Sequence, residues 1–96
     1  MFNELKGYKK IYEYDLFIGD SNYLHKGIGT KVIEIVNNYI YDNYQADCIV
    51  LRPFKRNQIA IRAYEKNQFH NVKEYNGKDT LGNNEKMILL INTKEK

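Results

Sequence analysis

The chain has 96 residues, of which 43% are hydrophobic and 28% charged, so we expect a folded domain rather than a disordered segment. No apolar run approaches the roughly 20 residues that span a bilayer, and the first residues lack the apolar core of a signal peptide. The formal net charge is +3, but the lysines are scattered and form no basic stripe. These features argue against a membrane protein and against a nucleic-acid partner.

The cysteine and histidine content argues against a metal or disulfide protein. Cys48 is the only cysteine, so no internal disulfide can form, and we expect a cytoplasmic location. Cys48 lies in an apolar run with no histidine near it, so we interpret it as a small buried hydrophobe rather than a nucleophile. Neither His25 nor His70 has a carboxylate or cysteine at a metal-ligand spacing, and no metal is expected.

The N-terminal half predicts a strand, a turn and a helix. Residues 10–19 alternate and are rich in isoleucine, tyrosine and phenylalanine, which is typical of a strand, and a turn cluster follows at residues 19–22. Apolar residues then recur at helical spacing from Thr30, and we expect this helix to bury one face and to end near Asn43. The side chains of that face are Val32, Ile33, Ile35, Val36, Tyr39 and Ile40.

The C-terminal half predicts a strand, a short helix and two further strands. Residues 47–52 are mostly apolar in succession, so we expect a strand that is buried on both faces and that Pro53 terminates. Asn57 is suited to cap the next helix, which should end near Asn67 with that asparagine as a left-handed cap. Further strands are expected at residues 69–75 and 86–92, a turn at Asn76 and Gly77, and a loose stretch at residues 81–84.

The predicted order is therefore strand, helix, strand, helix, strand, strand. Strands that alternate with helices indicate an α/β (α+β) fold with a mixed sheet and at least one parallel pair. No internal repeat or low-complexity linker divides the chain, so residues 1–96 are expected to form a single domain.

A glycine loop precedes the first helix, at residues 23–30. Gly27 and Gly29 remove side chains where a ligand could approach the backbone, Lys26 adds a positive charge, and the helix places its partial positive end at this loop. The loop indicates a phosphate-bearing cofactor, and an ordinary strand-to-helix turn is the alternative. Val32 stands where a dinucleotide fingerprint requires a third glycine, and no Walker pattern is present.

The second helix carries a tyrosine that has two possible roles. Tyr64 lies on the face of Ala60 and Ile61, which is natural for a core residue. The small side chains of Ala60 and Ala63 would also let a thin ligand chain pass, with the Tyr64 phenol beside it as a proton donor.

Residues 24–29, Leu-His-Lys-Gly-Ile-Gly, resemble the acetyl-CoA loop Q/R-x-x-G-x-G/A of the GCN5-related N-acetyltransferase (GNAT) superfamily. Residues 57–69 are similar to the pattern N-x-x-A-I-R-A-Y-x-K-x-G-F of its aminoglycoside 6'-N-acetyltransferase branch, and residues 14–23 resemble the strand before the loop in that branch. Leu24 departs from the first loop position, and Gln68 replaces the glycine of the second pattern.

The resemblance covers roughly residues 10–91 and implies a partial GNAT fold that binds acetyl-CoA where two parallel strands, residues 10–18 and 47–52, splay apart. A substrate amine would attack the thioester directly, and Tyr64 would protonate the departing thiolate. Asp15 matches the carboxylate proposed as the base, although it could instead anchor a cationic substrate or be an exposed strand residue. The implied acetyl-CoA contacts are the strand backbone at Phe17 and Ile18, the loop N–H groups of Lys26, Gly27, Ile28, Gly29 and Thr30, the side chain of Asn57, and the space beside Ala60.

Compared with the family pattern, the chain corresponds to the C-terminal portion and lacks the usual N-terminal strands and helices, which form much of the acceptor pocket. The strand from Lys10 to Ile18 would then have an unpaired edge. We therefore expect a homo-oligomer, or pairing with a chain that covers this edge, and a truncated gene or fragment is the alternative.

The resemblance implies an N-acetyltransferase that uses acetyl-CoA and a small-molecule amine, with an aminoglycoside antibiotic as a candidate acceptor and antibiotic resistance as the result. The carboxylates of Glu13, Asp15, Asp20 and Asp79 could offer negative charge to a polycation. An acetyltransferase of protein N-termini or of another small amine is one alternative. A CoA-binding or interaction module without catalytic turnover is another.

Overall fold

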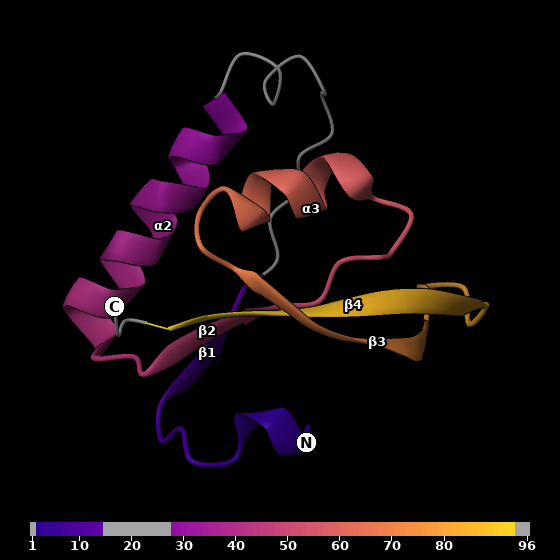
Figure 1. Cartoon of the computed structure of the whole chain (residues 1–96), viewed down its shortest axis with the longest axis horizontal. Helices are drawn as coiled ribbons and strands as arrows, with labels where there is room; N and C mark the ends of the chain where they lie inside the picture. Colours follow the sequence, from indigo (N-terminus) through magenta and orange to yellow (C-terminus); the bar gives the residue numbers. More distant parts are fainter. Residues whose placement is uncertain (1, 15–27, 94–96) are drawn as a thin grey trace.

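The computed structural model describes residues 2–14 and 28–93 of the chain. It confirms the predicted order of strands and helices and adds a short 3-10 helix ahead of them (Figure 1). The elements are η1 (Asn3–Leu5), β1 (Ile11–Glu13), α2 (Ile28–Tyr44), β2 (Cys48–Leu51), α3 (Gln58–Glu65), β3 (His70–Lys78) and β4 (Asn84–Thr93).

The strands form one mixed sheet with the order β1-β2-β4-β3. β1 and β2 are parallel, with Ile11 opposite Cys48 and Glu13 opposite Val50, whereas β4 is antiparallel to both β2 and β3. α2 and α3 lie on one side of the sheet, and η1 lies on the other (Figure 1). The predicted mixed α/β sheet with a parallel pair is therefore confirmed.

β2 is buried on both faces, as its uninterrupted apolar sequence predicts. Ile49 and Leu51 face the helices and pack in a core cluster with residues of α2 and α3. Cys48 and Val50 face the opposite side, where Leu5 of η1 belongs to a second cluster. The side chains alternate between the two clusters because successive residues of a strand point to opposite faces.

β1 lies at the edge of the sheet, and among the described residues β2 is its one strand partner. The register of this pair ends at Glu13 opposite Val50, while Leu51 continues to pair with Leu90 of β4. The predicted edge strand is confirmed for Ile11–Glu13. Residues 15–19 of the predicted strand lie outside the described residues.

The face that α2 buries differs from the prediction. Ile33 and Ile40 are buried, but Val32, Ile35 and Tyr39 are 38%, 57% and 57% exposed. The six apolar residues cover a wider arc of the helix than the sheet and α3 can contact. Polar side chains share the buried face instead: Asn37 is buried, and the buried Tyr41 hydroxyl donates to the backbone carbonyl of Asn92 at 3.0 Å.

The end of α3 also differs from the prediction. Asn67 is not the left-handed residue; Gln68 is, with φ 65°. The Asn67 side chain instead donates to the carbonyl oxygens of Thr30 and Ala63, at 3.0 and 3.2 Å. Asn67 therefore joins the C-terminal end of α3 to the first turn of α2.

The turn expected at Asn76 and Gly77 is wrong, because both residues lie within β3, opposite Lys86 and Glu85. Gly77 serves packing there: a Cβ on it would lie 2.6 Å from Cγ of Met87. The hairpin turns at residues 79–83 instead, where the carboxylate of Asp79 accepts hydrogen bonds from backbone N–H groups of the turn.

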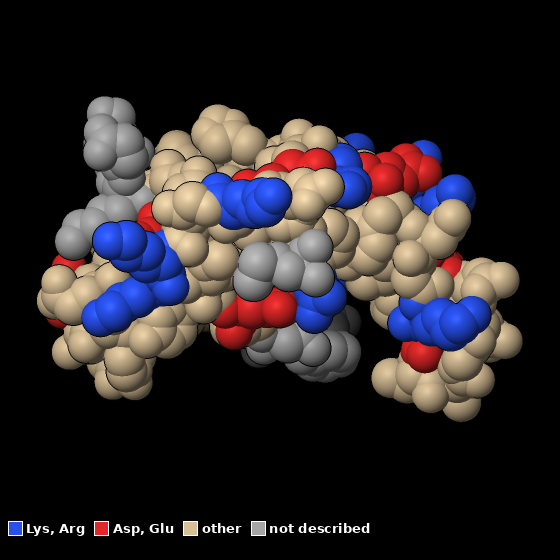
Figure 2. All heavy atoms as spheres, turned by 90° about the horizontal axis from the view of Figure 1, so that it is seen from below, with Lys and Arg blue, Asp and Glu red and all other residues tan. Residues whose placement is uncertain are grey.

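Charges of both signs are interspersed on the face of the molecule shown in Figure 2, which is the underside of the view in Figure 1. Ion pairs such as Lys73 with Glu4, at 3.5 Å, and Lys55 with Glu74, at 2.9 Å, join sequence-distant segments. Among the described helices, none is long and apolar enough to cross a membrane.

Candidate active site

Two of the candidate residues, Asn57 and Tyr64, lie at the N-cap of α3 and on its buried face. Asn57 caps the helix, because its Oδ1 accepts a hydrogen bond from the backbone N–H of Ala60 at 3.4 Å. Tyr64 is only 5% exposed, and its ring makes an edge contact with Phe69 at a centroid distance of 5.9 Å. Tyr64 is therefore a core residue, which is one of the two roles that its position in the sequence allowed.

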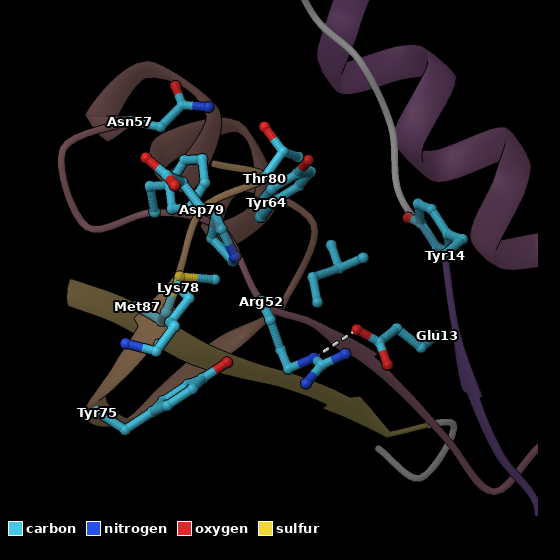
Figure 3. Close-up of a pocket in the computed structure, with 14 residues that line it drawn as sticks. Glu13, Tyr14, Arg52, Asn57, Tyr64, Tyr75, Lys78, Asp79, Thr80 and Met87 are labelled. Carbon is cyan, nitrogen blue, oxygen red and sulfur yellow. Dashed lines mark hydrogen bonds and ion pairs between the residues drawn. The ribbon is translucent and has the colours of Figure 1, made fainter. Parts of the chain in front are cut away.

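Tyr64 and Asn57 also line a pocket of about 900 Å³. The pocket extends from the carboxyl end of β1, through the segment that follows β2 and the inner face of α3, to the hairpin turn of β3 and β4 (Figure 3). Ligands of α/β sheets bind at the carboxyl ends of parallel strands, and this is where β1 and β2 end. Tyr64 thus has both a core role and access to a candidate binding site.

Tyr14, the residue after β1, brings a second phenol to this pocket. Its hydroxyl donates to Oδ1 of Asn37 on α2 at 2.7 Å, and Asn37 is only 6% exposed. Burial raises the pKa of Tyr14, and the neighbouring Tyr64 and Tyr41 add to the rise. Tyr14 therefore remains a neutral hydrogen-bond donor at physiological pH.

Glu13 and Arg52 form an ion pair between the ends of the parallel strands. Nε of Arg52 lies 2.5 Å from Oε2 of Glu13, and this hydrogen bond raises the pKa of Arg52, with a smaller contribution from Tyr75. Figure 3 shows the guanidinium between the Glu13 carboxylate and the Tyr75 hydroxyl. Burial raises the pKa of Tyr75 itself. Glu13, one of the carboxylates considered for a polycationic acceptor, is thus paired with Arg52.

Asp79 lies at the hairpin end of the pocket. Its Oδ1 accepts from the backbone N–H groups of Leu81 and Asn83, both at 2.9 Å. The hydrogen bond from Asn83 is the main cause of a lowered pKa at Asp79. This carboxylate stabilises the turn, and it is already engaged by the chain.

Tyr14 and Arg52, which line the pocket, and Asn37, which accepts a hydrogen bond from Tyr14, were not predicted from the sequence. A signal for Asn37 was present, because an asparagine four residues after Ile33 falls on the apolar face of the helix. A signal for Arg52 was also present, because a charged residue that directly follows a buried parallel strand stands at the ligand-binding edge of a sheet.

The glycine-loop residues that the structure describes lie at the N-terminal end of α2. Ile28, Gly29 and Thr30 form its first turn, and Gly29 is buried. Asn67 holds the Thr30 carbonyl and itself accepts a hydrogen bond from Nδ2 of Asn92 at 3.0 Å. The first turn of α2 is thereby fixed to the end of α3 and to β4.

The remaining predicted residues divide into two groups. Ala60 is 3% exposed within the core cluster and does not line the pocket, and neither do Gly29 and Thr30. Five residues, Asp15, Phe17, Ile18, Lys26 and Gly27, lie outside the described residues.

The described part of the chain contains no group of three or more histidine, cysteine, aspartate or glutamate residues that could hold a metal ion. Cys48 is fully buried, and burial raises the pKa of its thiol to about 11. This supports its interpretation as a buried hydrophobe.

Residues 9–76 match the family model described as acetyltransferase (GNAT) domain. The match spans more than half of the chain, and the chain belongs to the GNAT acetyltransferase family, as its two motifs predicted.

Two solved structures of an aminoglycoside acetyltransferase, AAC(6')-Ib, share this fold. One is a complex with coenzyme A and the other a complex with coenzyme A and kanamycin; each has a TM-score of 0.70 and 23% sequence identity to this chain. The similarity covers 86% of this chain but 45% of theirs. The predicted partial GNAT fold is therefore confirmed, and the chain spans slightly less than half the length of those relatives.

Proposed function

We propose that this chain is an acetyl-CoA-dependent N-acetyltransferase that acetylates a primary amine. The observation that carries the proposal is the position of Tyr64, which lines a large pocket at the carboxyl ends of the parallel strands β1 and β2 in a chain of the GNAT family. The lone buried Cys48 also supports a reducing, cytoplasmic location.

The residues at the start of α2 fit a phosphate group of acetyl-CoA, which supplies the activated acetyl group. The first turn of a helix has N–H groups without partners inside the helix, and the buried Gly29 presents no side chain that would block them. Asn67 holds this turn in place through Thr30. In this proposal Lys26 and Gly27 complete the loop, and the pantetheine arm runs past Phe17, Ile18 and Asn57.

The reaction joins the acceptor nitrogen to the acetyl carbonyl carbon and breaks the carbon–sulfur bond of the thioester. One proton leaves the ammonium group, and the departing thiolate takes up one. We assign uptake of the first proton, or anchoring of the ammonium, to Asp15, and donation of the second to Tyr64.

An aminoglycoside is one candidate acceptor, because kanamycin is bound in one of the similar structures. Such an activity would make the chain an antibiotic-resistance enzyme. Other small amines and protein N-termini also fit an N-acetyltransferase that acts on a primary amine.

The test replaces the phenol of Tyr64. We expect Tyr64→Phe to reduce the rate of thiol release from acetyl-CoA, with kanamycin and simple amines as acceptors, by about 100-fold or more, while acetyl-CoA affinity is kept. Tyr39→Phe is the matched control, because Tyr39 is exposed and does not line the pocket. An unchanged rate in Tyr64→Phe would overturn the role of Tyr64.

A second candidate function is a CoA-binding module without turnover. The observation that favours it is coverage of only 45% of the similar structures, since an acceptor site can draw on the remainder of such a chain. Acetyl-CoA binding without thiol release from any acceptor would support this candidate.

A further inference from the structure

Arg52 lines the candidate pocket at the carboxyl end of β2. It directly follows β2, whose last residue, Leu51, also lines the pocket, and it stands opposite the end of β1. Its side chain is 44% exposed, so the guanidinium is reachable by a ligand. We propose that Arg52 binds a carboxylate of the acceptor, so that the acceptor is an amino acid or a similar amine that carries a carboxylate; this inference rests on the acetyltransferase function proposed above.

The guanidinium of Arg52 is held in place and retains donors for a ligand. Its ion pair with Glu13 uses Nε, whereas a guanidinium has four further N–H donors on its terminal nitrogens. Glu13 on one side and Tyr75 on the other fix the orientation of the group (Figure 3). A fixed planar guanidinium suits bidentate recognition of a carboxylate, because little side-chain entropy is lost on binding.

The charged side chains of the described lining carry no excess of negative charge. Glu13 and Asp79 contribute two carboxylates, and Arg52 and Lys78 contribute two cations. Both carboxylates are already engaged, Glu13 by Arg52 and Asp79 by backbone N–H groups of Leu81 and Asn83. The formal charges of these four side chains cancel, so the described lining does not supply the excess of negative charge that would favour a polycationic acceptor.

The charge of Arg52 also suits a monoanion. Glu13 offsets part of the positive charge, so a carboxylate with a single charge is better matched than a dianionic phosphate. The same pocket holds the phenols of Tyr64 and Tyr14, and an acceptor anchored by its carboxylate at Arg52 would extend its amine toward them.

The experiment compares ω-amino acids from β-alanine to 6-aminohexanoate with the matching ω-amino amides, which have nearly the same shape but no negative charge. Acetyl transfer is measured in the wild type, in Arg52→Gln, and in Arg56→Gln as a control. Arg56 is a suitable control because it pairs with Glu85 at 2.6 Å and does not line the pocket. Thermal unfolding of each variant establishes that it is folded.

We expect the wild type and Arg56→Gln to favour at least one acid over its amide by about tenfold or more in kcat/KM. In Arg52→Gln this preference should fall to about one, while the rate with the amides is largely kept. Equal use of acids and amides by the wild type, or a preference that survives in Arg52→Gln, would overturn the inference and leave the acetyltransferase function standing.

If no acceptor is acetylated, a binding measurement tests the carboxylate site at Arg52 instead. The same acids and amides are titrated into the chain saturated with coenzyme A. Acid binding that exceeds amide binding and that disappears in Arg52→Gln supports the carboxylate site, and absence of this difference overturns it. Failure of the acetyltransferase proposal is seen separately, as a lack of acetyl-CoA binding.

Discussion

At the residue scale, the hydrogen bond from Tyr14 to Asn37 connects the end of β1 to α2 across 23 positions of the sequence. Tyr14→Phe removes the donor to a buried amide oxygen, and we expect the free energy of unfolding to fall by about 1–3 kcal/mol. Urea unfolding measures the change, and Tyr39→Phe, at an exposed site on α2, should have almost no effect. A loss as small as that of the control would contradict a structural role for this hydrogen bond.

Because the thiol of Cys48 is buried, we expect the free energy of unfolding to fall in alkaline solution. Burial raises its pKa in the folded state to about 11, so the unfolded chain loses this proton at lower pH than the folded chain. The stabilisation from the buried thiol is complete below the unfolded pKa and is lost as the pH rises through the folded value. The free energy of unfolding should therefore fall between about pH 9 and pH 11.

Cys48→Ala isolates the contribution of this thiol from that of the buried tyrosines. The variant will be less stable overall because of the cavity it creates, but its stability should decline less steeply over the same pH interval. An identical slope in the wild type and in Cys48→Ala would contradict the assignment of this pH dependence to the thiol.

The sequence predicted side-chain interactions between residues that are close along the chain. It did not predict those between residues that are far apart along the chain. The cap at Asn57 was predictable, because it bonds to a backbone N–H three residues away. The pair formed by Glu13 and Arg52 joins residues 39 positions apart. From the sequence alone, each of these side chains would be interpreted as a charge exposed to solvent. The parallel register of β1 and β2 is needed to predict that they pair.

At the element scale, the end of α3 contains a strained residue. Gln68 has φ 65°, which glycine adopts more easily than glutamine. Gln68→Gly should raise the free energy of unfolding by about 0.5–1 kcal/mol. Lys66→Gly is the matched control, since Lys66 is right-handed with φ −67°, and it should lower stability by a similar amount. Destabilisation by Gln68→Gly would contradict this account.

Periodicity predicted the helices and strands well, and turn residues predicted the hairpin poorly. The apolar run of β2 and the helical spacing of α2 are local signals that survive in the fold. The Asn76–Gly77 pair is a strong turn signal, but Gly77 is needed where Met87 crosses it closely. The local sequence does not reveal this contact with the opposite strand. The contact keeps Gly77 within β3, and the turn therefore lies at residues 79–83.

At the scale of the whole molecule, aromatic and aliphatic side chains of β1 and α2 lie together beside the edge of the sheet. Tyr12 of β1 stacks on Tyr44 of α2 at 5.4 Å, and Tyr39 makes an edge contact with Tyr44 at 5.9 Å. Val32 and Ile35 continue this exposed apolar surface along α2. An edge strand beside exposed apolar side chains is typical of a surface that pairs with another chain.

We expect the chain to associate with a second chain, or a second copy of itself, through β1. Sedimentation of the purified chain should show association that depends on concentration, and the amides of Ile11–Glu13 should become protected from hydrogen exchange as it forms. A monomer at all concentrations, with freely exchanging amides in this strand, would contradict this expectation.

A calorimetric titration of the chain with acetyl-CoA tests the proposed cofactor site without any acceptor. We expect saturable binding to one site per chain, with a dissociation constant below about 1 mM. We also expect Gly29→Val to weaken this binding, because a side chain would then occupy the first turn of α2 where we propose that the phosphate binds. Val72→Ala, at an exposed site on β3, should leave it unchanged. No binding by the folded wild-type chain would contradict the proposed acetyltransferase function.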